Sequence, residues 1–197
     1  SDIDLVIYGL LSFDAVRQQL VQAVRAGLLA ELTEVDWRRV YERRGEMPIS
    51  FDEYQWHEKR KQNKFILRLP STGTTVTNTQ AIQTQAAVLQ PTTLDLSCVS
   101  VPHPITFTAG RKLGQQTITA RVISDQHAFN TPAVFELDHP HIGWLVVNTA
   151  TYVGQAFAGE TIEARGFVET LHDGSMRLVV GASREAPSEF LRVVSAN

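Results

Sequence analysis

The first nine residues, SDIDLVIYG (1–9), alternate between polar and apolar side chains in a way that predicts a β-strand. Successive side chains of a strand point to opposite faces, so the isoleucine and leucine side chains of this stretch share one face. Asp2 and Asp4 then lie together on the other face, and Gly9 ends the strand. Two carboxylates on one face repel each other until water, a proton or a cation relieves the repulsion. This strand therefore provides both the start of the fold and the first candidate site.

Three helices are predicted after this strand. Ser12 is expected to cap the first helix. Its apolar stripe, with a residue at every fourth position, comprises Val16, Leu20, Val24 and Leu28. Thr33 and Asp36 predict a capping box at the start of the second helix, and SFDE (50–53) predicts one for the third. Residues 65–69, FILRL, are predicted to form a short apolar strand.

The rest of the chain has a different pattern. Residues 71–93 are rich in Thr and Gln and carry no charge, which indicates a linker between an N-terminal segment (1–70) and a β-rich segment (94–197). We therefore predict an α+β fold, in which a partial strand-and-helix unit precedes an all-β unit that is a small barrel or a sandwich. Asp173 and Gly174 predict a two-residue type I′ turn between two alternating strands.

The composition is typical of a globular protein, with 43% hydrophobic residues, 20% charged residues and a mean hydropathy of −0.10. No apolar run approaches the length that spans a bilayer, so a soluble protein without a membrane partner is expected. Cys98 is the single cysteine, which indicates the reducing cytoplasm, and it is predicted to be a small buried side chain. The net charge of −3 gives no global attraction to nucleic acid. Residues 1–70 nevertheless hold 11 of the 18 Lys and Arg, so a polyanion site is expected there.

Asp2 and Asp4 have the chemistry of a magnesium site. Mg²⁺ takes one or two carboxylates together with substrate phosphates, and a pair of such ions holds both oxygens of a phosphoryl transfer. The alternative from the pattern alone is two solvated carboxylates at the edge of a sheet. The motif does not distinguish these interpretations without further context.

SDIDLVIYG and the predicted helix after it resemble the second strand region of the nucleotidyltransferase superfamily of the DNA polymerase β type. The pattern of that family is Gly-Ser, a short helical turn and then Ser-Asp-x-Asp-Leu. The chain is also similar to uncharacterised prokaryotic nucleotidyltransferase-like proteins with a β-rich tail, over residues 37–68, 153–169 and 177–190. The resemblance implies that Asp2 and Asp4 are catalytic residues that bind Mg²⁺, and that Ser1 contributes to nucleotide binding.

The end of the third predicted helix and the residues after it supply four candidates for phosphate binding: Lys59, Arg60, Lys61 and Lys64. The alternative is a solvated helix end, because cations also suit the negative pole of the helix dipole. Both interpretations stay open at this point. The neighbouring aromatic side chains are predicted to lie in the core rather than to stack on a base, namely Trp37, Tyr41, Tyr54 and Trp56.

The resemblance implies a Mg²⁺-dependent nucleotidyltransferase, which transfers a nucleoside monophosphate from a nucleoside triphosphate to an acceptor that the sequence does not identify. The Gly-Ser pair of the family is expected before Ser1, and the strand at residues 65–69 contains no third carboxylate. The missing third carboxylate favours an alternative, a catalytically inactive nucleotide- or RNA-binding protein whose β-domain recognises a partner. A third interpretation is a fragment without activity of its own. The free strand edge beside Asp2 also permits a homo-oligomer.

Overall fold

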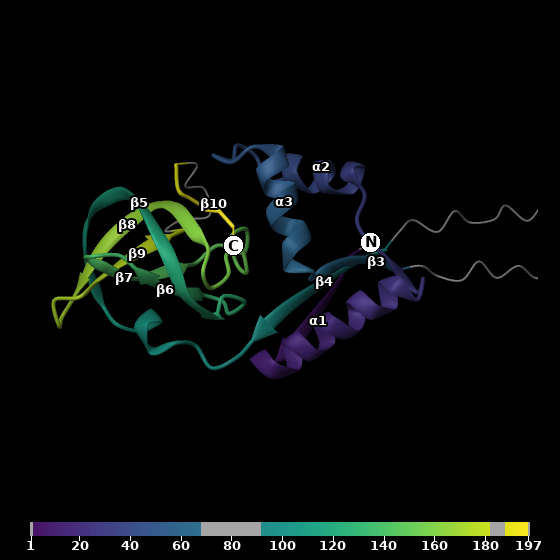
Figure 1. Ribbon diagram of the computed structural model, residues 1–197, viewed down its shortest axis with the longest axis horizontal. Helices are drawn as coiled ribbons and strands as arrows, with labels where there is room; N and C mark the ends of the chain where they lie inside the picture. Colours follow the sequence, from purple (N-terminus) through teal and green to yellow (C-terminus); the bar gives the residue numbers. More distant parts are fainter. Residues whose placement is uncertain (1, 68–91, 182–187, 197) are drawn as a thin grey trace, which may run out of the picture.

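The protein has two β-sheets and three α-helices within the residues described by this computed structural model, which are 2–67, 92–181 and 188–196. The helices lie with the N-terminal sheet, and the β-rich sheet stands beside this α/β unit (Figure 1). The predicted α+β class is confirmed. In this part of the chain no helix has the length and apolar character needed to cross a membrane.

The N-terminal sheet has four strands in the order β1, β4, β3, β2. These are β1 (Asp2–Tyr8), β2 (Leu29–Ala30), β3 (Lys64–Leu67) and β4 (Thr92–Val99). β1 runs parallel to β4, whereas β3 is antiparallel to both of its neighbours. Within the described residues β1 is therefore an edge strand, as the sequence predicts.

The position of β4 differs from the expectation. β4 follows residues 68–91, which lie outside the described residues together with most of the predicted linker at 71–93. Seven residues of β4 pair with β1, so this strand belongs to the N-terminal sheet. The boundary predicted at residue 94 is wrong for this strand, because the chain returns after the linker to complete the first sheet.

α1 (Leu10–Arg25) covers one face of this sheet, while α2 (Glu34–Glu42) and α3 (Phe51–Lys61) lie on the other side (Figure 1). α1 packs on the strands through a buried cluster that includes Phe13, Leu94, Leu96 and Cys98. The partly buried Val16, Leu20 and Val24 of its stripe pack against this cluster. The prediction that Cys98 is buried is confirmed. The cap at Ser12 is wrong, because Gly9, with φ of 88°, turns β1 directly into the helix. Leu28 lies beyond the end of α1 and is exposed, so it is not part of the stripe.

The capping boxes of the other two helices are confirmed. The hydroxyl of Thr33 accepts a hydrogen bond from the N–H of Asp36, whose carboxylate accepts one from the N–H of Thr33 at 2.9 Å. Ser50 and Glu53 form the same reciprocal pair at the start of α3. Each box satisfies two N–H groups that have no partner within the helix, which is why these helices begin where the sequence predicts.

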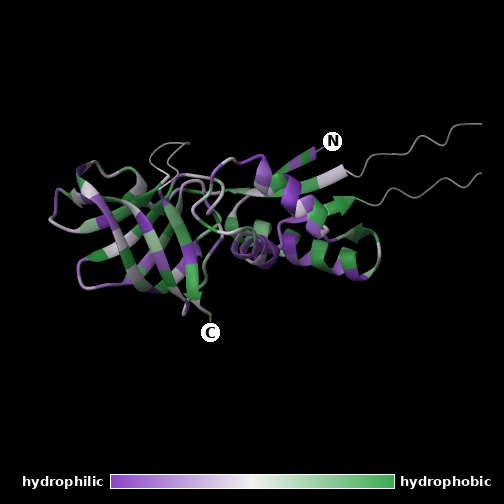
Figure 2. Ribbon diagram, turned by 90° about the horizontal axis from the view of Figure 1, so that it is seen from above, coloured by the Kyte–Doolittle hydropathy of each residue, from purple (hydrophilic) through white to green (hydrophobic). Residues whose placement is uncertain are grey.

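The β-rich sheet has the order β10, β8, β5, β6, β7, β9, with an additional pairing between β8 and β9. Its elements, with the short 3₁₀-helix η1 before them, are η1 (Pro104–Thr106), β5 (Gly110–His127), β6 (Ala133–Asp138), β7 (Ile142–Val147), β8 (Thr161–Leu171), β9 (Met176–Val180) and β10 (Phe190–Ser195). β5 is long enough to pair with β8 along its first part and with β6 along its second. Hydrophobic and hydrophilic residues alternate along several of these strands (Figure 2), which places one set of side chains in the core.

The predicted hairpin between β8 and β9 is confirmed, but the turn type is wrong. The two strands pair antiparallel on either side of the turn. A type I′ turn needs positive φ at both central residues, and Gln62 is the only non-glycine with positive φ in the described part of the chain. Gly174 has φ of 84°, and its N–H donates to the carbonyl of Leu171 at 3.1 Å. This pattern indicates a three-residue loop that ends in a glycine bulge.

α3 connects the two sheets through polar contacts. Arg192 of β10 forms an ion pair with Glu53 at 3.4 Å. The N–H of Val193 donates to Nε2 of His57 at 3.4 Å. Aromatic residues of α2 and α3, including Trp37, belong to the same buried cluster as the interior of the β-rich sheet. The N-terminal unit and the β-rich sheet therefore share one core.

A substitution at Gly166 of β8 tests how closely β9 approaches β8. A Cβ at this position would lie 2.2 Å from the backbone oxygen of Val179, and a backbone atom cannot rotate away. We expect Gly166→Ala to lower the free energy of unfolding by about 1–3 kcal/mol, the usual cost of overpacking. Gly143→Ala is the matched control, because a Cβ there meets no atom within 4 Å. Urea unfolding followed by circular dichroism measures both variants, and equal losses would contradict the close approach.

Candidate functional site

The parallel pairing of β1 with β4 brings carboxylates together on one face of the sheet. Asp4 is in register with Asp95, and Asp2 is in register with Thr93. Paired positions of neighbouring strands share a face, so Asp95 lies beside Asp4. Asp2 and Asp4 are exposed, whereas Asp95 is partly buried. The structure therefore adds a third acidic residue next to the two that the sequence singled out.

A cleft of about 160 Å³ opens beside these carboxylates and is lined by residues of the N-terminal unit and of two loops of the β-rich unit. Its polar side includes Asp4, Asp95, Lys61, Lys64 and Arg44. Its other wall, from the segments that follow β5 and β7, includes Phe129, Thr131, Ala150 and Val153. The cleft thus combines carboxylates, ammonium groups and a mostly apolar wall.

Glu58 of α3 is the centre of a buried charge network next to this cleft. Its carboxylate forms an ion pair with Lys61 and a second one, at 3.3 Å, with Lys64. Burial raises the pKa of Glu58, but Lys61 and Lys64 outweigh that effect and hold the pKa at about 2. Lys61 is also buried, and it donates to the backbone oxygen of Thr151 at 2.8 Å. The network therefore ties α3 to the loop after β7.

Lys64 connects this network to the carboxylates of the sheet. Its Nζ lies 3.2 Å from Oδ2 of Asp95 as well as 3.3 Å from Glu58. Burial lowers the pKa of Lys64, but the charges of Glu58 and Asp95 outweigh it and raise the pKa above its usual range. Burial raises the pKa of Asp95; Lys64 opposes this rise, and Glu58 and Asp4 add to it. Lys64 therefore neutralises two carboxylates from different elements.

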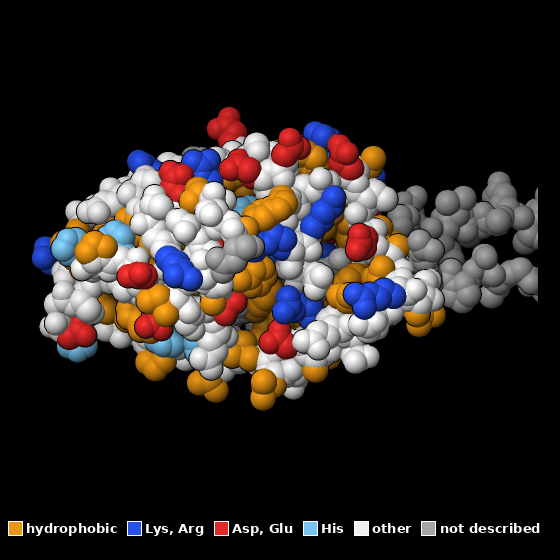
Figure 3. Space-filling view, in the orientation of Figure 1, with side chains coloured by type: hydrophobic (Ala, Val, Ile, Leu, Met, Phe, Trp, Pro, Cys, Tyr) orange, Lys and Arg blue, Asp and Glu red, His pale blue; other side chains and the backbone are white. Residues whose placement is uncertain are grey.

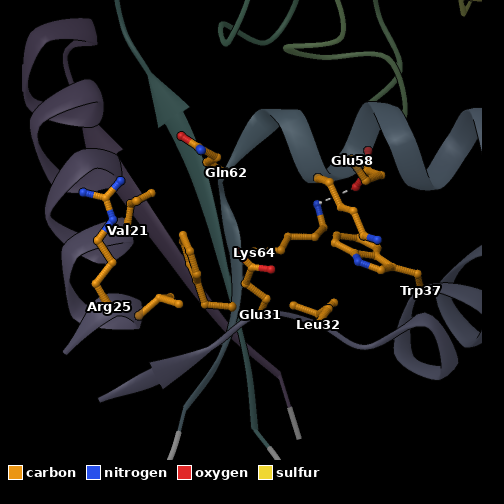
Figure 4. Close-up of a pocket in the computed structure, with 11 residues that line it drawn as sticks. Val21, Arg25, Glu31, Leu32, Trp37, Glu58, Gln62 and Lys64 are labelled. Carbon is orange, nitrogen blue, oxygen red and sulfur yellow. Dashed lines mark ion pairs between the residues drawn. The ribbon is translucent and has the colours of Figure 1, made fainter. Parts of the chain in front are cut away.

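Lys64 also lines a second cavity, of about 250 Å³, between α1 and α3 (Figure 4). Figure 4 shows Val21 and Arg25 on the α1 side of this cavity and Trp37 on the opposite side. The dashed line in the figure is the ion pair of Lys64 with Glu58. Lys64 thus lines both this cavity and the acidic cleft.

The structure separates the predicted phosphate-binding residues. Lys61 and Lys64 line the cleft. Lys59 is exposed and lines the second cavity, and Ser1 lies outside the described residues. Acidic and basic side chains are interspersed on the face seen in Figure 3 and form no patch of one sign there. The structure brings two of the five predicted residues to the carboxylates.

Arg60 points toward the β-rich sheet. It forms an ion pair with Glu160, and its guanidinium lies 4.1 Å from the centre of the Trp56 ring. Trp56 is 43% exposed, so the prediction of a core position is wrong for this residue. Trp37 and Tyr54 are buried, which confirms the prediction for them. These contacts give Arg60 a part in joining the two units.

The donors on the carboxylate face suit a hard cation, because carboxylate oxygens are the ligands that Mg²⁺ prefers. Within residues 2–67, 92–181 and 188–196, however, no three His, Cys, Asp or Glu side chains form a group that could hold a metal ion. Asp95 is instead paired with Lys64. The residues fit Mg²⁺ in their chemistry, and a cation that bridges them has to compete with this lysine.

Asp95 is the site residue that sequence reasoning missed. A signal for it is present, because the LDL of residues 94–96 repeats the apolar, acidic, apolar order of the IDL of residues 3–5. The expected domain boundary assigned this stretch to the β-rich segment and so separated it from Asp4. The pairing of β1 with β4 removes that separation.

The chain is 32% identical over 205 residues to the uncharacterized protein MJ1086 of Methanocaldococcus jannaschii. The alignment covers 98% of this chain and 54% of the archaeal protein, so the chain spans about half the length of that relative. No protein family model matches the chain, and no solved structure matches it significantly.

The charge network predicts different roles for two lysines of α3. Lys61→Met leaves the buried carboxylate of Glu58 without its closest partner, so we expect the free energy of unfolding to fall by about 3–5 kcal/mol. Lys59→Met is the matched control, because Lys59 is exposed, and we expect it to change stability by less than about 0.5 kcal/mol. Chemical unfolding of the three proteins at pH 7 measures the difference. A small effect of Lys61→Met would show that the buried pair is not needed for folding.

The lowered pKa of His57 predicts a loss of stability in mild acid. Burial lowers the pKa of His57 from 6.5 to about 4, and Lys61 and Arg60 add to this shift. Between these two pKa values the unfolded chain binds more protons than the folded one, so the free energy of unfolding falls as the pH falls from 6.5 toward 4. The full loss from this residue is up to about 3 kcal/mol.

The variant His57→Gln removes this titration, so we expect a flatter dependence of stability on pH in that window. His172→Gln, at an exposed position of the loop before β9, is the control and keeps the dependence of the unchanged protein. Urea unfolding between pH 4 and pH 7 compares the three. An unchanged slope in His57→Gln would show that another group is responsible.

Proposed function

We propose that the protein is a Mg²⁺-dependent nucleotidyltransferase of the cytoplasm, which transfers a nucleoside monophosphate from a nucleoside triphosphate to an acceptor still to be identified. The observation that supports this proposal is the register of Asp4 with Asp95. Together with Asp2 they give three carboxylates at adjacent positions of one sheet face. The strand at residues 65–69 contains no third carboxylate, and Asp95 is the candidate for that role.

Asp2, Asp4 and Asp95 are the residues that would hold Mg²⁺, which supplies charge neutralisation and orientation to a triphosphate. In the proposed reaction the acceptor hydroxyl gives its proton to Asp95, its oxygen attacks the α-phosphorus, and pyrophosphate leaves. Lys64 faces the same cleft and is the ammonium group placed to contact phosphate oxygens. Lys61 acts indirectly, since it is occupied by Glu58 and by the carbonyl of Thr151.

We further propose that the β-rich sheet is a small barrel. Its pairings run from β8 through β5, β6, β7 and β9 back to β8, with β10 added to β8. A five-stranded barrel is also the core of OB folds, which bind oligonucleotides and oligosaccharides. This is a likeness of topology, and by itself it assigns no function.

A catalytically inactive nucleotide- or RNA-binding protein is the second candidate. The ion pair between Lys64 and Asp95 favours it, because a paired carboxylate is less available to a metal ion. Replacement of both Asp2 and Asp4 by Asn then leaves RNA binding unchanged, whereas the first proposal requires these carboxylates. Filter binding with a labelled RNA pool distinguishes the two.

Heat stability in the presence of ligands tests the first proposal. A ligand at 100 times its dissociation constant stabilises by about 2.7 kcal/mol, which raises the melting temperature of a protein of this size by roughly 5–10 °C. We expect this rise when Mg²⁺ and a nucleoside triphosphate are added together, and a smaller rise with either one alone. Differential scanning fluorimetry with each of the four triphosphates measures it.

Three variants make the test specific. Asp4→Asn and Asp95→Asn each remove one carboxylate of the proposed set and should abolish the joint rise. Asp138→Asn is the control, because Asp138 is an exposed acid at the end of β6, away from the cleft. The same rise in Asp95→Asn as in the unchanged protein, or no rise at saturating ligand, would overturn the proposal.

A further inference from the structure

Lys64 is held by two carboxylates that belong to different parts of the N-terminal unit. Its Nζ lies 3.3 Å from Glu58 of α3 and 3.2 Å from Asp95 of β4. The side chain of Lys64 is 13% exposed, whereas that of Glu58 is 1% exposed and that of Asp95 is 36% exposed. The contact with Glu58 is therefore the buried one, and the contact with Asp95 is the one that opens to the cleft.

The same carboxylate of Asp95 completes the proposed set for a divalent cation. An ammonium group and a divalent cation at one carboxylate repel each other, so each weakens the binding of the other. Glu58 retains Lys61 as a partner whatever Lys64 does, and Lys64 retains Glu58 when it leaves Asp95. The network can therefore release Asp95 without leaving a buried charge unpaired.

We propose that Lys64 is a resident counter-ion, which neutralises Asp95 until a divalent cation displaces it and then turns its ammonium group to the phosphate oxygens of the nucleotide. This inference rests on the proposed function, whose metal set includes Asp95. It adds a regulation of that site, because binding of the cation and binding of the anion favour each other. The cation frees Lys64 to contact the phosphate oxygens, and the phosphate keeps Lys64 away from Asp95. The coupling between the two binding events is therefore reciprocal.

The reactivity of lysine side chains in the unchanged protein tests the release directly. The protein is treated briefly with an acetylating reagent, with and without Mn²⁺ as the probe cation, and the modified lysines are quantified by peptide mass spectrometry. We expect acetylation of Lys64 to rise when Mn²⁺ is bound. Lys59, which is exposed, is the internal control and should not change. An unchanged acetylation of Lys64 at saturating Mn²⁺ would overturn the proposal.

The affinity for Mn²⁺ provides a second test, with electron paramagnetic resonance of the free ion as the readout. Lys64→Met removes the competitor, so we expect the affinity for Mn²⁺ alone to increase about two- to fivefold, the range of a single partly exposed ion pair. Lys59→Met should bind as the unchanged protein does. A loss of stability explains lower affinity, but it does not explain a gain, so a gain supports the competition. Equal or weaker binding by Lys64→Met would contradict it.

Asp95→Asn separates this proposal from the proposed function. Mn²⁺ binding that is lost in Asp95→Asn but unaffected by Lys64→Met leaves the metal site in place and overturns only the counter-ion. Mn²⁺ binding that is absent from the unchanged protein, or unaffected in Asp95→Asn, overturns the metal site and the counter-ion with it.

Discussion

The in-register parallel pairing of β1 with β4 is the constraint on which the rest of the candidate site depends. It places Asp4 beside Asp95 on one face of the sheet. Neighbouring carboxylates repel each other, so this arrangement calls for positive charge close by. Lys64, on the strand that pairs with the other side of β4, supplies that charge. The position of one lysine thus follows from the alignment of two strands.

Lys64 also links the carboxylate face to α3 and, through Glu58 and Lys61, to the loop after β7. Lys64 shares Glu58 with Lys61, and Lys61 reaches the carbonyl of Thr151 in the loop after β7. Buried ionised groups are expensive unless each has a partner, and in this network each does. The carboxylate face and the loop that forms the opposite wall of the cleft are therefore linked by contiguous ion pairs and a hydrogen bond. This linkage holds the loop after β7 against α3 and the N-terminal sheet.

The features that the sequence predicts well are those with local causes. The capping boxes of α2 and α3 depend on residues three positions apart, and the hairpin between β8 and β9 depends on one short loop. The cap of α1 is Gly9 rather than the predicted Ser12, because a glycine with positive φ ends β1 and starts the helix without a polar side chain. The turn after β8 has one glycine in the left-handed region, whereas the dipeptide pattern indicated two residues there.

The features that could not be predicted are those with distant causes. Asp4 and Asp95 are separated by about 90 positions, and the chain between them includes the stretch at 68–91 that lies outside the described residues. No local pattern indicates that the strand after this stretch returns to β1. The sequence also did not indicate that Lys61 and Lys64 line the cleft whereas Lys59 does not, because this difference depends on which lysines contact Glu58. Helical spacing places Lys61 next to Glu58, but it indicates neither the burial of this pair nor the contact of Lys64 with Glu58.

A crystal of the protein soaked in Mn²⁺ and measured at the manganese absorption edge tests the central claim most directly. The account predicts an anomalous peak between the carboxylates of Asp4 and Asp95, with Nζ of Lys64 moved away from Asp95 and still close to Glu58. An absent peak, or one away from these carboxylates while Lys64 stays on Asp95, would contradict it.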